Sequence, residues 1–294
     1  MGAAGVVALS VACGATPAGE EETQPPGSSG TSESAPTSAT ESTQGVTLPE
    51  EAAHVHGVAV EPDTGEVLVA THAGLFVVPP PGGDKKAAPE QVGPTIDLMG
   101  FAVAGPGRLV ASGHPGPGTD MPNPVGLIES RDGGESWQAL SLAGASDFHS
   151  LAASEERIVG FDGRLRASDD GTAWETLAGG LQPVSLALSD DGRTIVATTE
   201  RGPMRSTDGG GEFAPVEDAP LLALVDWVAG TDSVYGVTVE GKIHRSDDAG
   251  TTWTSTGSLD GQPHALHADA EQLIVVADHQ VRRSTDEGTT FQGW

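Results

Sequence analysis

Histidine is the residue type whose number and spacing in this sequence most clearly suggest chemistry. The chain holds nine histidines beside a single cysteine and a single tyrosine, and several histidines recur at matching places in a repeated pattern. Imidazole, thioether and carboxylate groups together can ligate a transition metal, with thioether favouring Cu(I) and imidazole suiting copper or zinc. The candidate metal or ligand residues are His54, His56, His72, Met99, His114, Met121, His149, His264 and His279.

The spacing of these candidates predicts that they meet on one face of the fold. Short apolar segments recur along the chain, and four candidates begin one of them: His56, Met99, His149 and His264. The turn after the following segment holds a second group, namely His72, His114 and His279. We expect both groups around one channel mouth, with Asp120 and Met121 reaching it from an inserted loop at 113–124. Alternatively, these histidines only hydrogen-bond the backbone of neighbouring repeats and help to close the structure.

Carboxylates expected at the same mouth offer a second chemistry. Two such groups can serve as acid and base, or as acid and nucleophile, in glycoside hydrolysis. The sequence leaves their separation open, so it predicts neither retention nor inversion of the sugar configuration. The candidate catalytic carboxylates are Asp97, Asp120, Asp147, Asp162 and Glu200.

The elements that must position these side chains come from a repeat. Residues 246–253, Ser-Asp-Asp-Ala-Gly-Thr-Thr-Trp, are one of five near-copies, and the others start at 130, 168, 206 and 284. Aspartate accepts hydrogen bonds from amides of its own turn, and glycine supplies the positive φ that a tight turn requires. We therefore predict a structural role for one aspartate in each copy: Asp132, Asp170, Asp208, Asp248 and Asp286.

The period of the repeat indicates the architecture. The turns recur at intervals close to 40 residues, and three short apolar segments accompany each turn, with no helical periodicity. Six such units fill residues 47–294, which predicts an all-β, six-bladed β-propeller. The first unit lacks the aspartate turn and has Pro79-Pro80-Pro81-Gly82-Gly83 instead, so its outer strand should be irregular. The innermost strands are expected to begin at His56, Met99, His149, Val184, Trp227 and His264.

The repeated turn resembles the Asp-box of BNR repeats, Ser-x-Asp-x-Gly-x-Thr-Trp, which occurs in sialidases and other propellers. From His54 to Phe291 the chain resembles bacterial exported proteins grouped as sialidase-like, BNR-repeat glycosyl hydrolases. The resemblance rests on the turns and on patterns such as His54-Val-His56-Gly57 and Asp97-Leu-Met99-Gly100. It implies a propeller fold and glycoside hydrolysis.

The residues that a true sialidase needs are not evident. Such an enzyme uses a tyrosine nucleophile and an arginine cluster for the substrate carboxylate. The only tyrosine, Tyr235, lies among alternating apolar residues and is expected to be a core residue. Arg205, Arg245 and Arg282 lie next to the repeated turns, on the opposite face from the expected mouth. A carboxylate-based glycosidase therefore remains the enzymatic alternative.

The N-terminal region predicts export. Residues 1–13 hold a short apolar run that ends at Cys13, which resembles a bacterial lipoprotein signal segment with Cys13 as the lipidation site. Residues 14–46 are rich in Gly, Ser, Thr, Pro and Glu, a composition typical of a disordered linker. We expect an extracytoplasmic propeller at 47–294 that is anchored to the membrane only through lipid, or secreted.

Net charge narrows the possible partners. A formal charge of −28 disfavours nucleic acid and acidic membranes, because no basic patch is available for phosphate. We expect a monomer that binds a metal ion, preferably copper or zinc, or a small glycan. A protein-binding scaffold or assembly factor is the further alternative, and it would require an exposed apolar patch.

Overall fold

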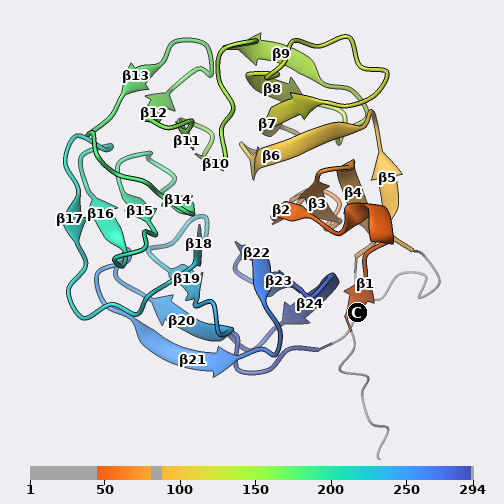
Figure 1. Cartoon of the computed structure of the whole chain (residues 1–294). Helices are drawn as coiled ribbons and strands as arrows, with labels where there is room; N and C mark the ends of the chain where they lie inside the picture. Colours follow the sequence, from red (N-terminus) through yellow and green to blue (C-terminus); the bar gives the residue numbers. More distant parts are fainter. Residues whose placement is uncertain (1–44, 81–87, 293–294) are drawn as a thin grey trace, which may run out of the picture. The chain divides into compact units, whose positions relative to one another are not determined.

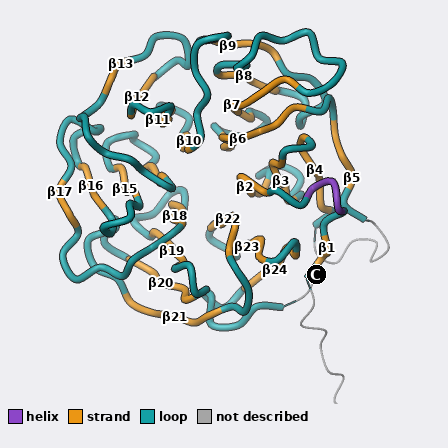
Figure 2. The backbone as a smooth tube through the Cα atoms, viewed as in Figure 1, coloured by secondary structure: helices purple, strands orange, loops and turns teal. Residues whose placement is uncertain are grey.

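Six antiparallel sheets of four strands each build the folded part of the chain. A computed structural model describes residues 45–80 and 88–292, so the predicted lipoprotein signal segment at 1–13, most of the predicted linker at 14–46, and residues 81–87 lie outside the described residues. The sheets stand as blades around a central axis (Figure 1). The prediction of an all-β, six-bladed β-propeller is confirmed. The single helical turn among the described residues is η1 (Glu50–Ala52), drawn in purple in Figure 2.

We number the blades 1 to 6 in chain order and give their strands from the centre outwards. The innermost strands are β2 (Val55–Val60), β6 (Ile96–Val103), β10 (Ser150–Ala153), β14 (Leu186–Leu188), β18 (Leu224–Trp227) and β22 (Pro263–Ala268). The second strands are β3 (Val67–Thr71), β7 (Leu109–Pro115), β11 (Ile158–Phe161), β15 (Ile195–Ala197), β19 (Val234–Val237) and β23 (Leu273–Ala277). The third strands are β4 (Gly74–Val78), β8 (Leu127–Ser130), β12 (Leu165–Ser168), β16 (Met204–Ser206), β20 (Lys242–Ser246) and β24 (Gln280–Ser284). The outermost strands are β5 (Glu90–Val92), β9 (Gln138–Ser141), β13 (Glu175–Thr176), β17 (Ala214–Pro215), β21 (Thr254–Ser258) and β1 (Val46–Thr47).

Apolar side chains between neighbouring blades form the core. The second strands are mainly apolar because both of their faces are covered, and every residue of β3 and β23 is buried. One apolar cluster joins Leu68 and Leu75 of blade 1 to Leu98 and Leu109 of blade 2. Each blade thus buries its faces against its neighbours, and the stacked blades hold the innermost strands around the axis.

The ring closes through the N-terminal strand. Strand β1 is the outermost strand of blade 6, where it pairs with β24 through Val46 and Val281. Val46, whose neighbours in sequence have the composition of a linker, is therefore part of a blade. Near the C-terminus, Gln292 also pairs with β24, through Arg283. Strand β1 has only two residues and lies more than 230 positions before its partner β24. Local sequence patterns therefore could not predict this pairing.

The innermost strand of blade 5 begins earlier than we expected. Trp227 is the last residue of β18 and not the first. It pairs with Val234 of β19, just as Val60, the last residue of β2, pairs with Val67 of β3 in blade 1. The side chain of Trp227 is buried, and its indole nitrogen donates to the carbonyl of Thr231 at 2.9 Å. Residues 221–228 are almost continuously apolar, so the pattern indicates no strand boundary there.

The five repeated aspartates each accept hydrogen bonds inside their own turn. In the turn of blade 5, the Asp248 carboxylate accepts bonds from Thr252 N at 2.7 Å and from Ser246 Oγ at 2.8 Å. Ser246 Oγ in turn accepts a bond from the buried Gly250 N at 2.9 Å. These bonds hold the pKa of Asp248 at about 2, although its partial burial opposes that shift. The aspartates are thus occupied by local structure.

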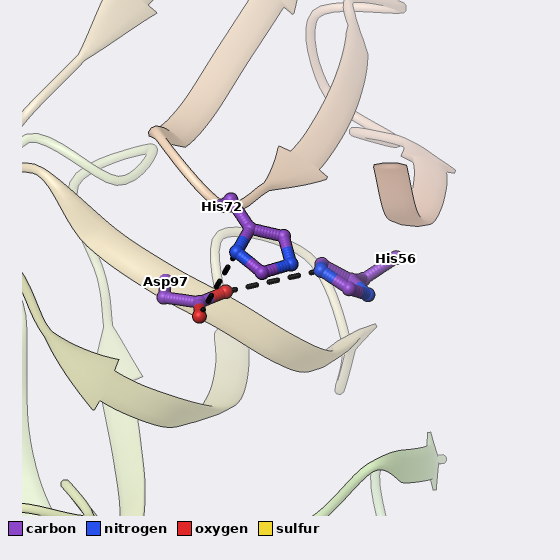
Figure 3. A group of neighbouring side chains, drawn as sticks. All are labelled: His56, His72 and Asp97. Carbon is purple, nitrogen blue, oxygen red and sulfur yellow. Dashed lines mark ion pairs between the residues drawn. The ribbon is translucent and has the colours of Figure 1, made fainter. Parts of the chain in front are cut away.

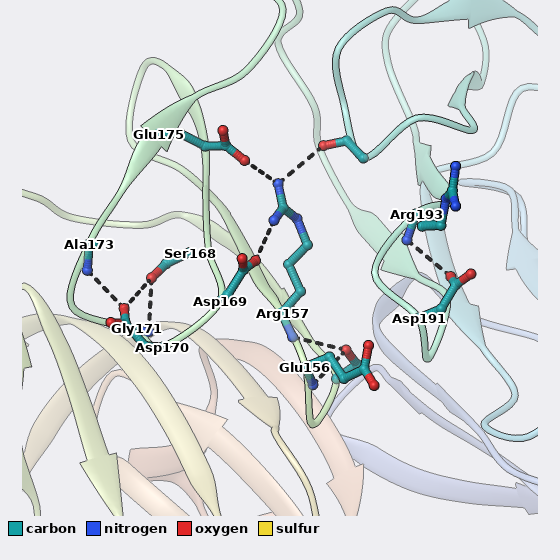
Figure 4. A network of polar contacts seen from close by, with 12 residues as sticks. Glu156, Arg157, Ser168, Asp169, Asp170, Gly171, Ala173, Glu175, Asp191 and Arg193 are labelled. Carbon is teal, nitrogen blue, oxygen red and sulfur yellow. Dashed lines mark hydrogen bonds and ion pairs between the residues drawn. The ribbon is translucent and has the colours of Figure 1, made fainter.

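Arginine side chains connect neighbouring blades near these turns. Arg157 of blade 3 forms ion pairs with Asp169 and Glu175 (Figure 4). Its guanidinium also lies 3.5 Å from the Gly209 carbonyl of blade 4. Arg205 of blade 4 donates to the Ala249 carbonyl of blade 5 at 2.6 Å. These arginines support the ring on the face away from the histidines.

Candidate functional site

A β-bulge places the first histidine of the site. The pairing of β2 with β3 shifts register between Val55 and Gly57, so His56 is the unpaired residue. The corresponding register shifts in blades 2 and 6 leave Met99 and His264 without a partner in the neighbouring strand. A bulge re-aims the side chain of its extra residue. The three side chains line the central channel, a cavity of about 950 Å³ that His149 also lines.

His56, His72 and Asp97 form a compact three-residue cluster. One ligand atom from each residue lies within 4.8 Å of the other two. The Asp97 carboxylate is 3.2 Å from His72 Nδ1 and 3.8 Å from His56 Nε2 (Figure 3). His72 comes from the turn between β3 and β4, and Asp97 from β6 of the next blade. The cluster therefore spans the junction of blades 1 and 2.

Burial controls the protonation of this cluster. The side chains of His56 and Asp97 are each 20 % exposed. Burial, together with the nearby charges of His72, His54 and His149, lowers the pKa of His56 to about 4. Burial also raises the pKa of Asp97. At neutral pH His56 is thus an uncharged imidazole, the form that binds metals.

Two polar atoms of the cluster have no hydrogen-bond partner among the described residues. They are His56 Nε2 and Asp97 Oδ1, and both are buried. Buried polar atoms are nearly always paired, so an unpaired nitrogen and oxygen that face each other at 3.8 Å indicate space for a shared partner. His54 lies beside the cluster, with its ring centroid 5.0 Å from that of His72.

A second group lies at the adjacent junction. Asp147, which precedes β10, has its Oδ2 atom 3.1 Å from His114 Nε2 and 2.8 Å from His149 Nε2. His114 lies at the end of β7 and pairs in register with Asp97 of β6. The other ring nitrogen of His114 is 2.7 Å from Asn123 Oδ1. The hydrogen bond to Asn123 is the largest cause of the raised pKa of His114, and Asp147 and Asp97 add to it.

The structure brings together only part of the predicted ligand set. His56, His72, Asp97, His114, Asp147 and His149 meet at the mouth over blades 1 to 3, with His54 beside them. Met99 and His264 line the channel without joining either group. His279 is exposed on the turn of blade 6. Met121 packs against the apolar cluster between blades 1 and 2, as suits its thioether, and joins neither histidine group.

Of the five candidate catalytic carboxylates, two lie in the histidine groups and three lie elsewhere. Asp97 and Asp147 belong to the two groups, whereas Asp120 and Glu200 are exposed on loops. Asp162 has a side chain only 6 % exposed and is held by Ser146 Oγ at 2.7 Å and by Arg166. Together with Asp147 and His149, Asp162 lines a cavity of about 360 Å³.

Sequence reasoning missed an ionic group deeper in the channel. His267 of blade 6 lies 3.1 Å from Asp226 of blade 5 and 3.6 Å from Asp269. His267 and Asp226 are each the next-to-last residue of an innermost strand. Alignment of the repeats by strand ends, in place of strand starts, would have shown this acid and base at the same position of adjacent blades.

Blades 4 and 5 present different side chains. The large exposed apolar residues of the described chain are Val184, Leu221 and Val239. By strand register they lie where blades 1 to 3 carry His and Asp. Blades 4 and 5 thus carry an apolar side chain at three of these positions, and blade 4 carries Glu200 in the turn that corresponds to His72.

Together these observations define a β-propeller with a histidine- and aspartate-lined mouth. No known family profile matches the sequence, and no curated protein matches it significantly. Solved structures do match. A gluconolactonase from Xanthomonas campestris has 14 % identity and a TM-score of 0.61, and the match covers 80 % of this chain and 86 % of the enzyme. YCF48 bound to a D1 peptide has 16 % identity and a TM-score of 0.52, covering 84 % and 82 %.

A GH74 enzyme from Niastella koreensis has 13 % identity and a TM-score of 0.56. The match covers 85 % of this chain but only 46 % of the enzyme, so the chain spans about half of its length. These identities show a shared fold and nothing finer. No helix among the described residues is long and apolar enough to cross a membrane.

Proposed function

We propose that the protein binds a divalent transition-metal ion, Zn(II) or Cu(II), at His56, His72 and Asp97. The observation that carries this proposal is the approach of three ligand atoms within 4.8 Å of one another from two blades. Two imidazoles and one carboxylate are a common set for zinc, and imidazole also suits copper. Three protein ligands leave a coordination position open for water or another ligand.

The electrostatics of the cluster favour a cation. The net charge of −28 draws cations towards the protein, and Asp97 supplies a partly buried negative charge at the site itself. A metal ion between His56 Nε2 and Asp97 Oδ1 would give both unpaired atoms a partner. It would also offset the desolvation that raises the pKa of Asp97.

Ligand type favours the divalent ions over Cu(I). Cu(I) is selected by soft sulfur ligands, and neither Met99 nor Met121 belongs to the three-residue cluster. Of the metals expected from the sequence, Zn(II) and Cu(II) therefore fit the nitrogen and oxygen atoms best.

Titration of the full chain with Zn(II) and Cu(II) tests this function, in a Cys13→Ser background that removes the only thiol. His56→Ala and His72→Ala should each weaken binding at least tenfold. His279→Asn is the matched control, because it removes an exposed imidazole at a positive φ that asparagine tolerates. Equal binding by the wild type, both site variants and the control would refute the proposal.

Glycoside hydrolysis is a second candidate, favoured by the presence of Asp97 and Asp147 at one mouth. The likeness to a GH74 enzyme supports only the fold for this function. Hydrolysis of an oligosaccharide that is abolished by Asp147→Asn, and insensitive to chelators, would favour this candidate over metal binding.

Protein binding is a third candidate, based on exposed Val184, Leu221 and Val239. YCF48, a neighbour in fold, was solved with a bound peptide. We further propose that the protein works outside the cytoplasm, attached through a lipid on Cys13. Radiolabelled palmitate incorporation that Cys13→Ser abolishes would support this anchor, and unchanged incorporation would contradict it.

A further inference from the structure

We infer that exposed apolar residues of blades 4 and 5 form a docking surface for a basic, apolar peptide segment of a partner protein. The surface deepens the protein-binding candidate above and does not depend on a metal ion at the mouth. Val184, Leu221 and Val239 make up this surface, here called the apolar patch. They are the exposed large hydrophobic residues of the described chain, and each side chain is more than half exposed.

Short hydrogen bonds bring the three residues of the apolar patch to one place. Val184 N donates to Thr198 O at 2.9 Å, and Thr198 Oγ1 donates to Ala223 O at 3.0 Å. Ala223 follows Leu221 by two residues. Its backbone N donates at 2.8 Å to Val237 O, at the end of β19 and just before the turn that carries the last patch residue. The exposed apolar side chains are thus gathered over the junction of blades 4 and 5, whereas such residues are usually scattered singly over a protein surface.

The apolar patch continues into the central channel. Val184 lines the cavity of about 950 Å³, together with Leu186 of β14 and Leu224 of β18. A large apolar side chain that enters the channel beside Val184 would therefore leave water and contact apolar neighbours. A buried anchor of this kind commonly carries much of the binding energy of an interface.

Charge determines the chemistry of the partner. The segments that carry or adjoin the apolar patch hold more exposed carboxylates than exposed cations: Glu200, Glu217, Asp218 and Glu240 against Arg201 and Lys242. The surroundings are therefore acidic, on a chain with a net charge of −28. Repulsion between like charges disfavours a second copy of this chain as the occupant, and it also disfavours an acidic membrane. A peptide with Lys or Arg beside large apolar side chains complements both the patch and its acidic surroundings.

Binding of a synthetic peptide tests this docking surface. The probe is a short, fluorescently labelled peptide of alternating leucine and lysine, capped at both ends, and its anisotropy is measured with the full chain in EDTA. Because EDTA removes metal ions, the result is independent of the metal site. The wild type should bind this peptide. Matched peptides with glutamate in place of lysine, or serine in place of leucine, should bind about tenfold more weakly or less tightly still.

A triple variant separates docking at the apolar patch from general attraction to an acidic protein. Val184→Ser/Leu221→Ser/Val239→Ser keeps every charge and removes the apolar contacts, so it should weaken peptide binding by about tenfold or more. Circular dichroism and thermal unfolding verify that the variant folds. Equal binding by the wild type and the folded triple variant would show that charge alone attracts the peptide, and would overturn the docking surface.

A pair of charge variants tests the acidic surroundings. Glu217→Gln/Glu240→Gln should weaken binding of the leucine–lysine peptide by about threefold or more. Glu155→Gln/Glu156→Gln is the matched control, because it removes the same charge from the exposed turn between β10 and β11, at the other end of the channel. Equal weakening by both variants would contradict a partner that is recognised at the apolar patch.

The remaining outcomes keep this surface distinct from the proposed metal site. No binding of the leucine–lysine peptide by the wild type would overturn the docking surface. Self-association of the chain that the triple variant abolishes, measured by sedimentation velocity, would assign the patch to a second copy and overturn it as well. Zinc binding by the triple variant should equal that of the wild type, so failure of docking and failure of metal binding are observed separately.

Discussion

His267 Nδ1 of blade 6 lies 3.1 Å from Asp226 Oδ2 of blade 5, and the same oxygen accepts a hydrogen bond from Ala268 N at 2.7 Å. Burial alone would lower the pKa of His267, but Asp226 and Asp269 outweigh it and raise that pKa to about 9. The imidazolium is therefore charged at neutral pH and holds two blades together inside the channel.

The stability of the protein should consequently fall in mild alkali. Because the pKa of folded His267 is raised from 6.5, its contribution is complete below pH 6.5 and is lost as pH rises through 9. The raised pKa corresponds to about 3 kcal/mol of unfolding free energy. Chemical unfolding at pH 6 and pH 9.5 measures the loss. In His267→Gln the same pH change should have a much smaller effect, and equal losses in both proteins would contradict the prediction.

Ser246 tests the role of the repeated turns. Its Oγ accepts a hydrogen bond from the buried Gly250 N and donates one to Asp248. Ser246→Ala leaves this amide without a partner and should lower the free energy of unfolding by about 1–3 kcal/mol. Ser258→Ala, at an exposed position of β21, is the matched control and should change it by less than about 0.5 kcal/mol. If Ser246→Ala had the same free energy of unfolding as the wild type, the turn would not depend on this hydrogen bond.

The repeat made both the fold and the alignment of several site residues predictable from the sequence. Repetition places residues at equivalent points of successive blades, so the spacing of the repeats alone aligns His56, Met99 and His264. Repetition does not report distances between blades. It therefore could not show that Asp97 faces His56 and His72, or that His264 stays apart from them.

Two further features were out of reach for different reasons. Strand β1 closes the ring through pairing across nearly the whole chain, and two residues are too few to form a pattern. Asn123 lies in an irregular loop, where its contact with His114 depends on the path of residues 116–126. The sequence likewise could not show that Met121 packs against an apolar cluster, because a methionine near histidines can serve equally well as a ligand or as an apolar contact.

Leu48 tests the contribution of the closing segment. Its side chain is 4 % exposed and packs into the apolar cluster between blades 6 and 1, with Val276 and Val281 among its members. Leu48→Ala should lower the free energy of unfolding by about 2–5 kcal/mol, as truncations of buried leucines do. Leu221→Ala, whose side chain is 56 % exposed, is the control, and a similar loss there would contradict this interpretation.

Gly100 packs closely against the segment that carries Asp147 and His149. A Cβ atom at this residue would lie 2.4 Å from the Phe148 carbonyl oxygen, and Phe148 stands between Asp147 and His149. Gly100→Ala should cost about 1–3 kcal/mol of stability, because the two backbones would have to move apart. Gly179→Ala, where an added Cβ meets nothing within 4 Å, should leave the stability unchanged. A Gly100→Ala protein as stable as the wild type would contradict this close approach.

Asp97 should show opposite effects on stability and on binding. Burial raises its pKa, so above that pKa the charged carboxylate destabilises the metal-free fold. Asp97→Asn removes the charge at nearly constant size, and the metal-free protein should become equally or more stable at pH 7. The variant should also lose the stabilisation that Zn(II) gives to the wild type, which is about 2.7 kcal/mol at a free concentration one hundred times the Kd.

Thermal unfolding of both proteins, with and without zinc, measures these two effects together. If Asp97→Asn were less stable without metal yet still stabilised by zinc, Asp97 would be a structural partner of His72, and the ligands would have to be sought among the histidines alone. If instead the variant gains stability and no longer responds to zinc, the wild-type protein retains a destabilising charge at this mouth because a cation binds there.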